Sequence, residues 1–165
     1  MTGQAAAIGT RYPLLFSYRD TLFGTGLVLE VQVTNGRALC VQEAKDEYWI
    51  YGINPGGMAA HGATPDEAHT AFRRAFSHIL IDLANEAETF DHFQTAVEKF
   101  FNDTNPGYEG EWQQAILAVR RGDVTLDGVP MVPANSPRSI RVTIKQVEQV
   151  TPQDNSAQLQ YLLAA

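Results

Sequence analysis

One part of the first half of the chain alternates apolar and polar residues with the period of two that is typical of half-buried strands. The alternation is cleanest over residues 27–34, where the apolar positions are Leu27, Leu29, Val31 and Val33. Asn35-Gly36 follows directly. This pair favours a two-residue hairpin turn, because both turn positions require a positive φ. The pattern therefore predicts a strand over residues 27–34, a hairpin turn, and a returning strand over residues 37–43.

Two more strands are expected beside this pair. Lys45-Asp46 marks a second turn, and the aromatic stretch over residues 47–53 is typical of a third strand of an antiparallel meander. Residues 11–18 are also apolar and aromatic, and Pro13 places that segment at a sheet edge or at the start of a strand.

Residues 64–67 predict the start of a helix. Thr64 is a natural N-cap, Pro65 suits the first helical position, and Glu67 completes a capping box. Apolar residues then recur at helical spacing, which predicts a helix over residues 65–85. Its apolar stripe comprises Ala68, Phe72, Ala75, Phe76, Ile79 and Leu83.

The second half of the chain changes from helix back to strand. The spacing predicts helices over residues 91–101 and 109–121, the second with Gly122 as its C-cap. A small hairpin over residues 124–132 and a strand over residues 140–144 follow. Residues 151–165 suit a last strand, a short helix or a segment that packs on a partner.

These elements together predict an α+β fold in one domain of 165 residues. Its parts are an antiparallel β-meander, one long packed helix, a helical insertion and a C-terminal strand.

Composition narrows the function classes. The chain carries 12 Lys and Arg against 19 Asp and Glu, a net charge of −7. This balance disfavours general nucleic-acid binding, which needs clustered basic residues, and suits a basic partner. Cys40 is the single cysteine, so no intrachain disulfide forms, and a cytoplasmic location is expected. No apolar segment approaches the roughly 20 residues of a membrane span.

Residues 37–83 resemble the HicB family, the antitoxin half of bacterial HicA–HicB toxin–antitoxin pairs. The family pattern is a strand pair, a proline-glycine turn, a short strand ending in glycine, and Thr-x-x-Glu-Ala at a helix start. The matching residues here are Pro55-Gly56-Gly57 and Gly62-Ala63-Thr64-Pro65-Asp66-Glu67-Ala68. The spacing fits if Gly57 takes the family's turn glycine; matching Pro55-Gly56 instead leaves one extra residue.

The resemblance implies a partial double-stranded-RNA-binding-like fold that covers a small basic ribonuclease toxin. It implies a HicB-like core over about residues 27–86 and 139–150, with residues 87–122 as a helical insertion and the first 26 residues as an extension. The fold signature is Gly57, Gly62, Thr64 and Glu67, with the glycines expected at positive φ. Family members repress their promoter through a separate C-terminal DNA-binding module. No two amphipathic helices follow Ile144 here, so the resemblance does not extend to that DNA-binding module, and the sequence leaves DNA binding open.

No residue pattern indicates catalysis, a metal or a cofactor. The histidines are His61, His69, His78 and His92, and no His-Glu-x-x-His or paired-cysteine motif accompanies them. His61, at the junction of sheet and helix, could serve as the general base of a hydrolase. The ordinary interpretation is a turn histidine, and we predict that the chain is not an enzyme.

The candidate partner-binding surface lies on the third strand. Trp49 and Tyr51 must face one side of that strand, with Tyr48 and Ile50 on the other. One face is covered by the long helix, so the other either exposes its aromatics or is covered by the helices of residues 87–122. Aromatic residues with nearby acids favour a protein interface. The predicted partner-binding residues are Tyr48, Trp49, Tyr51, Glu43, Asp46 and Glu47.

These observations lead to two functional expectations. The first is a non-enzymatic HicB-like antitoxin, or a protein derived from one, that binds a small basic protein. The alternative is a stand-alone structural or binding protein with the same fold and no toxin partner. Self-association is expected in either case, because a short meander leaves edge strands that a second copy can cover.

Overall fold

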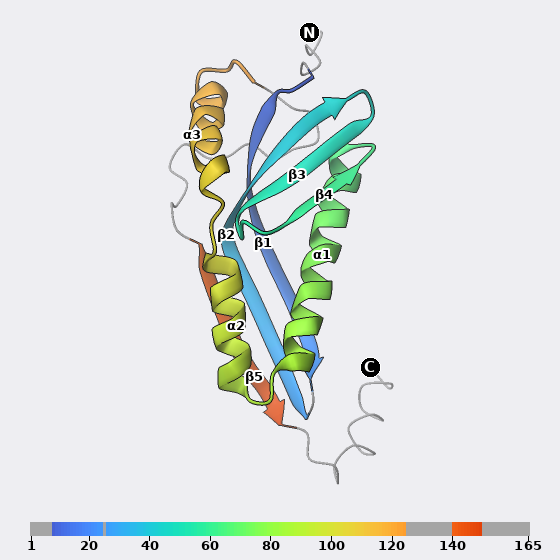
Figure 1. Cartoon of the computed structure of the whole chain (residues 1–165), viewed down its shortest axis with the longest axis vertical. Coiled ribbons are helices and arrows are strands. Elements are labelled where there is room, and N and C mark those ends of the chain that lie inside the picture. The colour runs from blue at the N-terminus through green and yellow to red at the C-terminus, as the bar shows by residue number, and fades with distance from the viewer. Residues whose placement is uncertain (1–7, 25, 125–139, 150–165) are drawn as a thin grey trace.

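The computed structural model describes residues 8–24, 26–124 and 140–149, which form an α+β fold. A curled antiparallel sheet carries the helices (Figure 1). The elements in chain order are β1 (Arg11–Gly24), β2 (Leu27–Ala44), β3 (Glu47–Asn54), β4 (Ala59–Gly62), α1 (Pro65–Glu86), α2 (Phe90–Asn102), α3 (Pro106–Arg120) and β5 (Arg141–Gln149).

Strand β2 is the centre of the sheet and runs along most of its length (Figure 1). Strand β1 pairs with one edge of β2 over residues 27–41. The other edge is shared: β5 pairs with residues 27–34 and β3 with residues 37–44. Strand β4 then pairs with β3. Both halves of β2 therefore pair with β1, whereas the first half also pairs with β5 and the second half with β3.

The hairpin predicted at Asn35-Gly36 is wrong, because β2 continues through it as one strand. Asn35 does have a positive φ of 60°, but Gly36 does not. The register between β1 and β2 shifts at this point, between Phe16 and Tyr18, which marks a β-bulge. A long β1 is what holds β2 extended, since it pairs on both sides of the bulge. The first residues therefore belong to the central sheet, and the expected strand over residues 11–18 continues to Gly24.

The remaining strands follow the sequence prediction. Asp46 has a φ of 56° in the turn between β2 and β3, and β3 covers the predicted third strand. The short strand β4 leads into α1. Strand β5 begins at Arg141, one residue later than the strand predicted over residues 140–144, and extends to Gln149.

Helix α1 begins as its cap residues predict. The Thr64 hydroxyl accepts a hydrogen bond from the Glu67 backbone N–H at 3.1 Å. The Glu67 carboxylate accepts from the backbone N–H of Ala63, one residue before the usual capping-box donor. The buried stripe is also shifted, because Leu80 and Ala84 are fully buried while others of the predicted stripe lie at its margin.

Helices α2 and α3 begin at side-chain caps of the same kind. Thr89 caps α2, and Asn105 caps α3 by accepting from the Gly107 N–H. Helix α3 therefore begins at Pro106, a turn earlier than predicted. Gly122 has a φ of 77° after its end, which confirms the predicted C-cap.

The helices divide between the two faces of the sheet. Helices α1 and α2 cover one face and form the main core with the inward side chains of the strands. Helix α3 packs on the other face of the sheet, over β3 and the second half of β2, where it forms a second hydrophobic cluster. The buried members of this second cluster are Leu39, Val41, Ile53, Trp112 and Ala115.

The signature glycines have a different role from the one expected. Neither Gly57 nor Gly62 has a positive φ. Gly62 is needed for close approach, since a Cβ there lies only 2.5 Å from the backbone nitrogen of Ala68 at the start of α1. A Cβ on Gly57 meets nothing within 4 Å, so the structure gives no reason for a glycine at this position.

Two sequence predictions fall outside the described residues. These are nearly all of the hairpin over residues 124–132 and the segment over residues 151–165. The predicted insertion over residues 87–122 contains α2 and α3, and α2 contributes Phe93, Val97 and Phe101 to the same core as α1.

Candidate functional site

Strand β3 presents aromatic side chains to both faces of the sheet, as its alternation predicts. Tyr48 packs against the main core on the side of α1, together with Ile50. Trp49 and Tyr51 lie on the opposite face, where Tyr51 borders the second cluster beneath α3. Tyr48 is therefore separated from the other two aromatic residues of the predicted surface.

Four rings form a continuous line across three elements, and we call them the aromatic row. Tyr108 of α3 stacks on Tyr51 with ring centroids 5.3 Å apart. Tyr51 stacks on Trp49 at 5.7 Å and an interplanar angle of 7°. Trp49 contacts His61 of β4 at 4.8 Å. Because Tyr51 has a ring on each side, it presents its edge to the surroundings rather than its faces.

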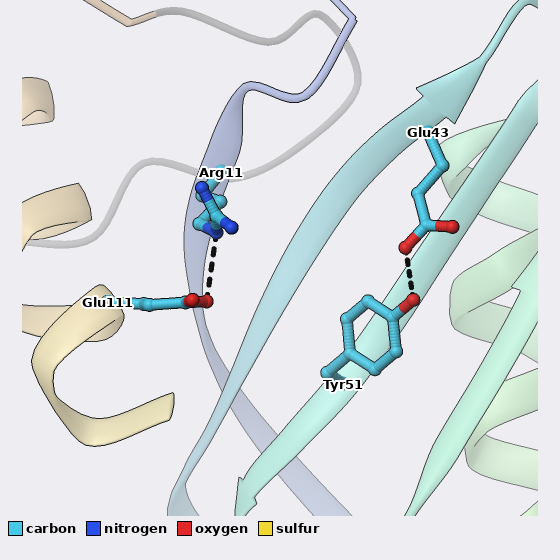
Figure 2. Close-up of polar contacts among 4 residues, drawn as sticks. All are labelled: Arg11, Glu43, Tyr51 and Glu111. Atoms are coloured by element: carbon cyan, nitrogen blue, oxygen red, sulfur yellow. Dashed lines mark hydrogen bonds and ion pairs between the residues drawn. The ribbon is translucent and has the colours of Figure 1, made fainter. Parts of the chain in front are cut away.

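Two carboxylates accept the polar groups of the row. Glu47 Oε1 accepts from the indole nitrogen of Trp49 at 2.9 Å. The phenol of Tyr51 donates to Glu43, and Figure 2 shows the hydroxyl pointing directly at that carboxylate. Burial first, and then the hydrogen bond to Glu43, raise the pKa of Tyr51, which keeps the phenol protonated as the donor. The rings thus hold both carboxylates in place while lone pairs remain for another donor.

The structure does not bring Asp46 into this arrangement. It lies in the turn between β2 and β3 and makes no hydrogen bond within the described residues. Among the predicted residues, the structure therefore joins Trp49, Tyr51, Glu43 and Glu47, and leaves Tyr48 and Asp46 apart.

Tyr108 is a member of the row that the sequence did not reveal. It follows Pro106 and Gly107 at the start of α3, where its spacing from the other aromatics carries no signal. It reaches Tyr51 because the loop before α3 is tied to the end of β3. The backbone N–H of Asn105 donates to the Ile53 carbonyl at 3.0 Å, and Gly56 N–H donates to the Asp103 carbonyl at 2.8 Å.

The outer face of β3 is only partly covered by α3. Helix α3 covers the part next to β2, where Leu39 and Ile53 are completely buried. The aromatic row lies at the margin of that covered area, with Trp49 and Tyr51 half-buried and His61 exposed. The row is therefore partly structural and partly surface.

Residues considered for other chemistry lack the arrangement that it requires. The ring of His61 lies tilted against that of Trp49, and its side chain makes no hydrogen bond within the described part of the chain. Cys40 is buried in the main core, and burial raises the pKa of its thiol to about 11, which leaves it protonated and unreactive at neutral pH. Burial first, and then Arg73, lower the pKa of His69. Over the described residues, no three His, Cys, Asp or Glu side chains gather as metal ligands.

Comparison of the chain with protein-family models, with curated proteins and with solved structures finds no match. Among the described helices, none has the length and apolar character needed to cross a membrane.

Proposed function

We propose that this chain is a non-enzymatic, HicB-like binding protein whose aromatic row and its two carboxylates receive a small basic protein partner. The observation that carries the proposal is the pairing of ring donors with Glu43 and Glu47 on a half-buried surface. Positioned carboxylates accept hydrogen bonds from arginine or lysine at little further entropic cost. The overall charge of −7 also favours the approach of a basic partner.

The family assignment within this proposal rests on the resemblance of residues 37–83. The element order that the resemblance implies is a strand pair, a turn, a short strand and a capped helix. Strands β2, β3 and β4 and helix α1 follow that order. The proposal includes neither a catalytic step nor DNA binding.

The test uses two basic probes and isothermal titration calorimetry. The first is an arginine-rich peptide of defined sequence, and the second is the product of the neighbouring open reading frame. We expect the E43Q/E47Q double variant to bind about tenfold more weakly, as expected for the loss of charge-assisted hydrogen bonds. Trp49→Ala should weaken binding by a similar factor, because the ring positions Glu47 and supplies contact area.

A matched control separates this site from general electrostatic attraction. The E86Q/E88Q double variant removes the same charge from exposed positions at the end of α1 and just after it. It should retain affinity within about twofold, as expected for remote, screened charges. Equal losses in both double variants, or no binding of either probe, would count against the proposed site.

A second candidate is a homo-oligomeric protein without a toxin partner. It is favoured by β1, which ends the strand path β1-β2-β3-β4 with a long edge that no other described strand covers. Such an edge can pair with a second copy. Light scattering of the purified chain tests this candidate. An oligomer that persists in Trp49→Ala favours pairing through β1, whereas an oligomer that dissociates in Trp49→Ala places the contact at the aromatic row.

A further inference from the structure

A second polar site lies at the β-bulge, on the opposite side of β2 from β3. A small hollow of about 180 Å³ opens there between β1, β2 and α1. It is smaller than the roughly 300–1,000 Å³ of pockets that hold drug-sized ligands. Its lining residues are Ser17, Tyr18, Arg19, Gln32, Val33 and Arg73.

The polar side chains of the hollow are mainly donors. Arginine, serine and glutamine side chains all carry N–H or O–H groups, and no carboxylate is among the lining residues. Arg19 donates to Glu30 at 2.9 Å, so its charge is balanced locally. Arg73 has no carboxylate partner within the described residues. Among the lining residues, Arg73 therefore carries a positive charge that no carboxylate of the described residues contacts.

Arg73 is also held in position. Its Nη1 donates to the backbone carbonyl of Ser17 at 2.9 Å, and its guanidinium lies 5.4 Å from the ring centroid of Tyr18. A guanidinium has five N–H donors, and this carbonyl uses one of them. The bulge makes the carbonyl contact possible, because Ser17 lies between the two registers of β1 against β2.

The neighbouring carboxylate of Asp20 does not fill the hollow. It accepts hydrogen bonds from the Tyr18 hydroxyl at 2.7 Å and from Ser77 at 3.1 Å. Burial is the main cause that raises the pKa of Tyr18 to about 12, so the phenol brings no negative charge near neutral pH.

We propose that this hollow binds a single phosphate group, with Arg73 as the principal ligand and Ser17 and Arg19 as further donors. Guanidinium groups suit phosphate because their planar forks donate two parallel hydrogen bonds. The proposal stands apart from the partner surface, since none of these residues belongs to the aromatic row.

Titration with inorganic phosphate, followed by amide chemical shifts in ¹H–¹⁵N spectra, tests the proposal. Sodium chloride keeps the ionic strength constant. We expect saturable shifts at residues 17–19 and 73, with a dissociation constant on the order of millimolar. O-phosphoserine, compared with serine, distinguishes a phosphate ester from the free ion: tighter binding than inorganic phosphate indicates that the ester is the ligand, and weaker binding indicates the free ion.

The neighbouring arginine provides the control. Arg73→Gln should weaken phosphate binding about tenfold, whereas Arg74→Gln, which makes the same charge change outside the hollow, should stay within about twofold. Ser17→Ala removes one exposed hydroxyl and should weaken binding about two- to fivefold even if Arg73→Gln perturbs the fold. Shifts that do not saturate, that chloride reproduces, or that change equally in the two arginine variants overturn the proposal.

Discussion

The two halves of β2 show how one strand can serve two different environments. In the first half, the buried residues Leu29, Val31 and Val33 alternate with polar Glu30 and Gln32 on the other side. Residues 36–41 are buried without a break. The first half is covered by helices on one face only, whereas the second has α1 on one face and α3 on the other.

The difference matches the residues that each half contains. Ala38-Leu39-Cys40-Val41 has no polar position, as expected for a strand that is buried on both faces. Arg37 is the charged residue that enters this buried half, and it needs a partner from α3. The bulge at Asn35 separates the two patterns.

Truncation of an outward-facing side chain should cost much more unfolding free energy in the second half of β2 than in the first. Leu39→Ala removes a completely buried side chain beneath α3 and should cost about 2–5 kcal/mol of unfolding free energy. Gln32→Ala, at an exposed outward position of the first half, should change it by about 0.5 kcal/mol or less. Urea unfolding of both variants measures the contrast. Similar costs would mean that α3 does not bury the outer face.

At the junction between the two halves of β2, a side chain at position 36 should lower the unfolding free energy. A Cβ there lies 2.3 Å from the ring of Phe16, so Gly36→Ala should cost about 1–3 kcal/mol through overpacking. The double variant with Phe16→Leu provides room and should lose less than the sum of the two single changes, as measured by a double-mutant cycle. Strict additivity would contradict the contact.

The charged residue of the buried half should depend on its partner. The Arg37 side chain is 10% exposed, and its Nη1 donates to Glu109 at 2.6 Å. The guanidinium also lies 5.8 Å from the centre of the Trp112 ring. Glu109→Ala leaves the buried guanidinium without a carboxylate and should cost about 1–2 kcal/mol.

Glu111 offers the control for this change on the same helix. It pairs with Arg11 at 2.9 Å, and Figure 2 shows this contact between β1 and α3. The Arg11 side chain is 50% exposed, so Glu111→Ala should cost well under about 1 kcal/mol. If thermal unfolding shows the same loss for both variants, burial of Arg37 contributes nothing.

Burial of the Cys40 thiol in the second half of β2 should make the unfolding free energy depend on pH. Its pKa is about 11 in the folded protein against 9.0 for an ordinary thiol, so the stabilising difference is complete below pH 9. It should be lost as pH rises from 9 to 11, because the unfolded chain releases the proton first. By pH 10 the loss is about 1 kcal/mol. The difference in unfolding free energy between wild type and Cys40→Ala, followed from pH 8 to 10.5, measures this contribution.

Local sequence signals identified most of the elements. Thr64 and Pro65 predicted the start of α1, Lys45-Asp46 predicted a turn, the aromatic stretch predicted β3, and alternation predicted β5. Each of these signals depends on near neighbours in the chain. The facing of Trp49 and Tyr51 followed from the period of a strand for the same reason. The α+β fold class follows from these elements.

Tertiary structure decided what depends on distant partners. Asn35-Gly36 has the local preference of a hairpin, yet pairing with β1 on both sides of it keeps β2 extended and turns the preference into a bulge. Tyr108 contacts Tyr51 because α3 packs on the sheet. Arg73 donates to the Ser17 carbonyl because α1 packs on the sheet. Backbone capping and side-chain alternation act within a few residues, whereas a surface is assembled by contacts between segments that the sequence keeps far apart.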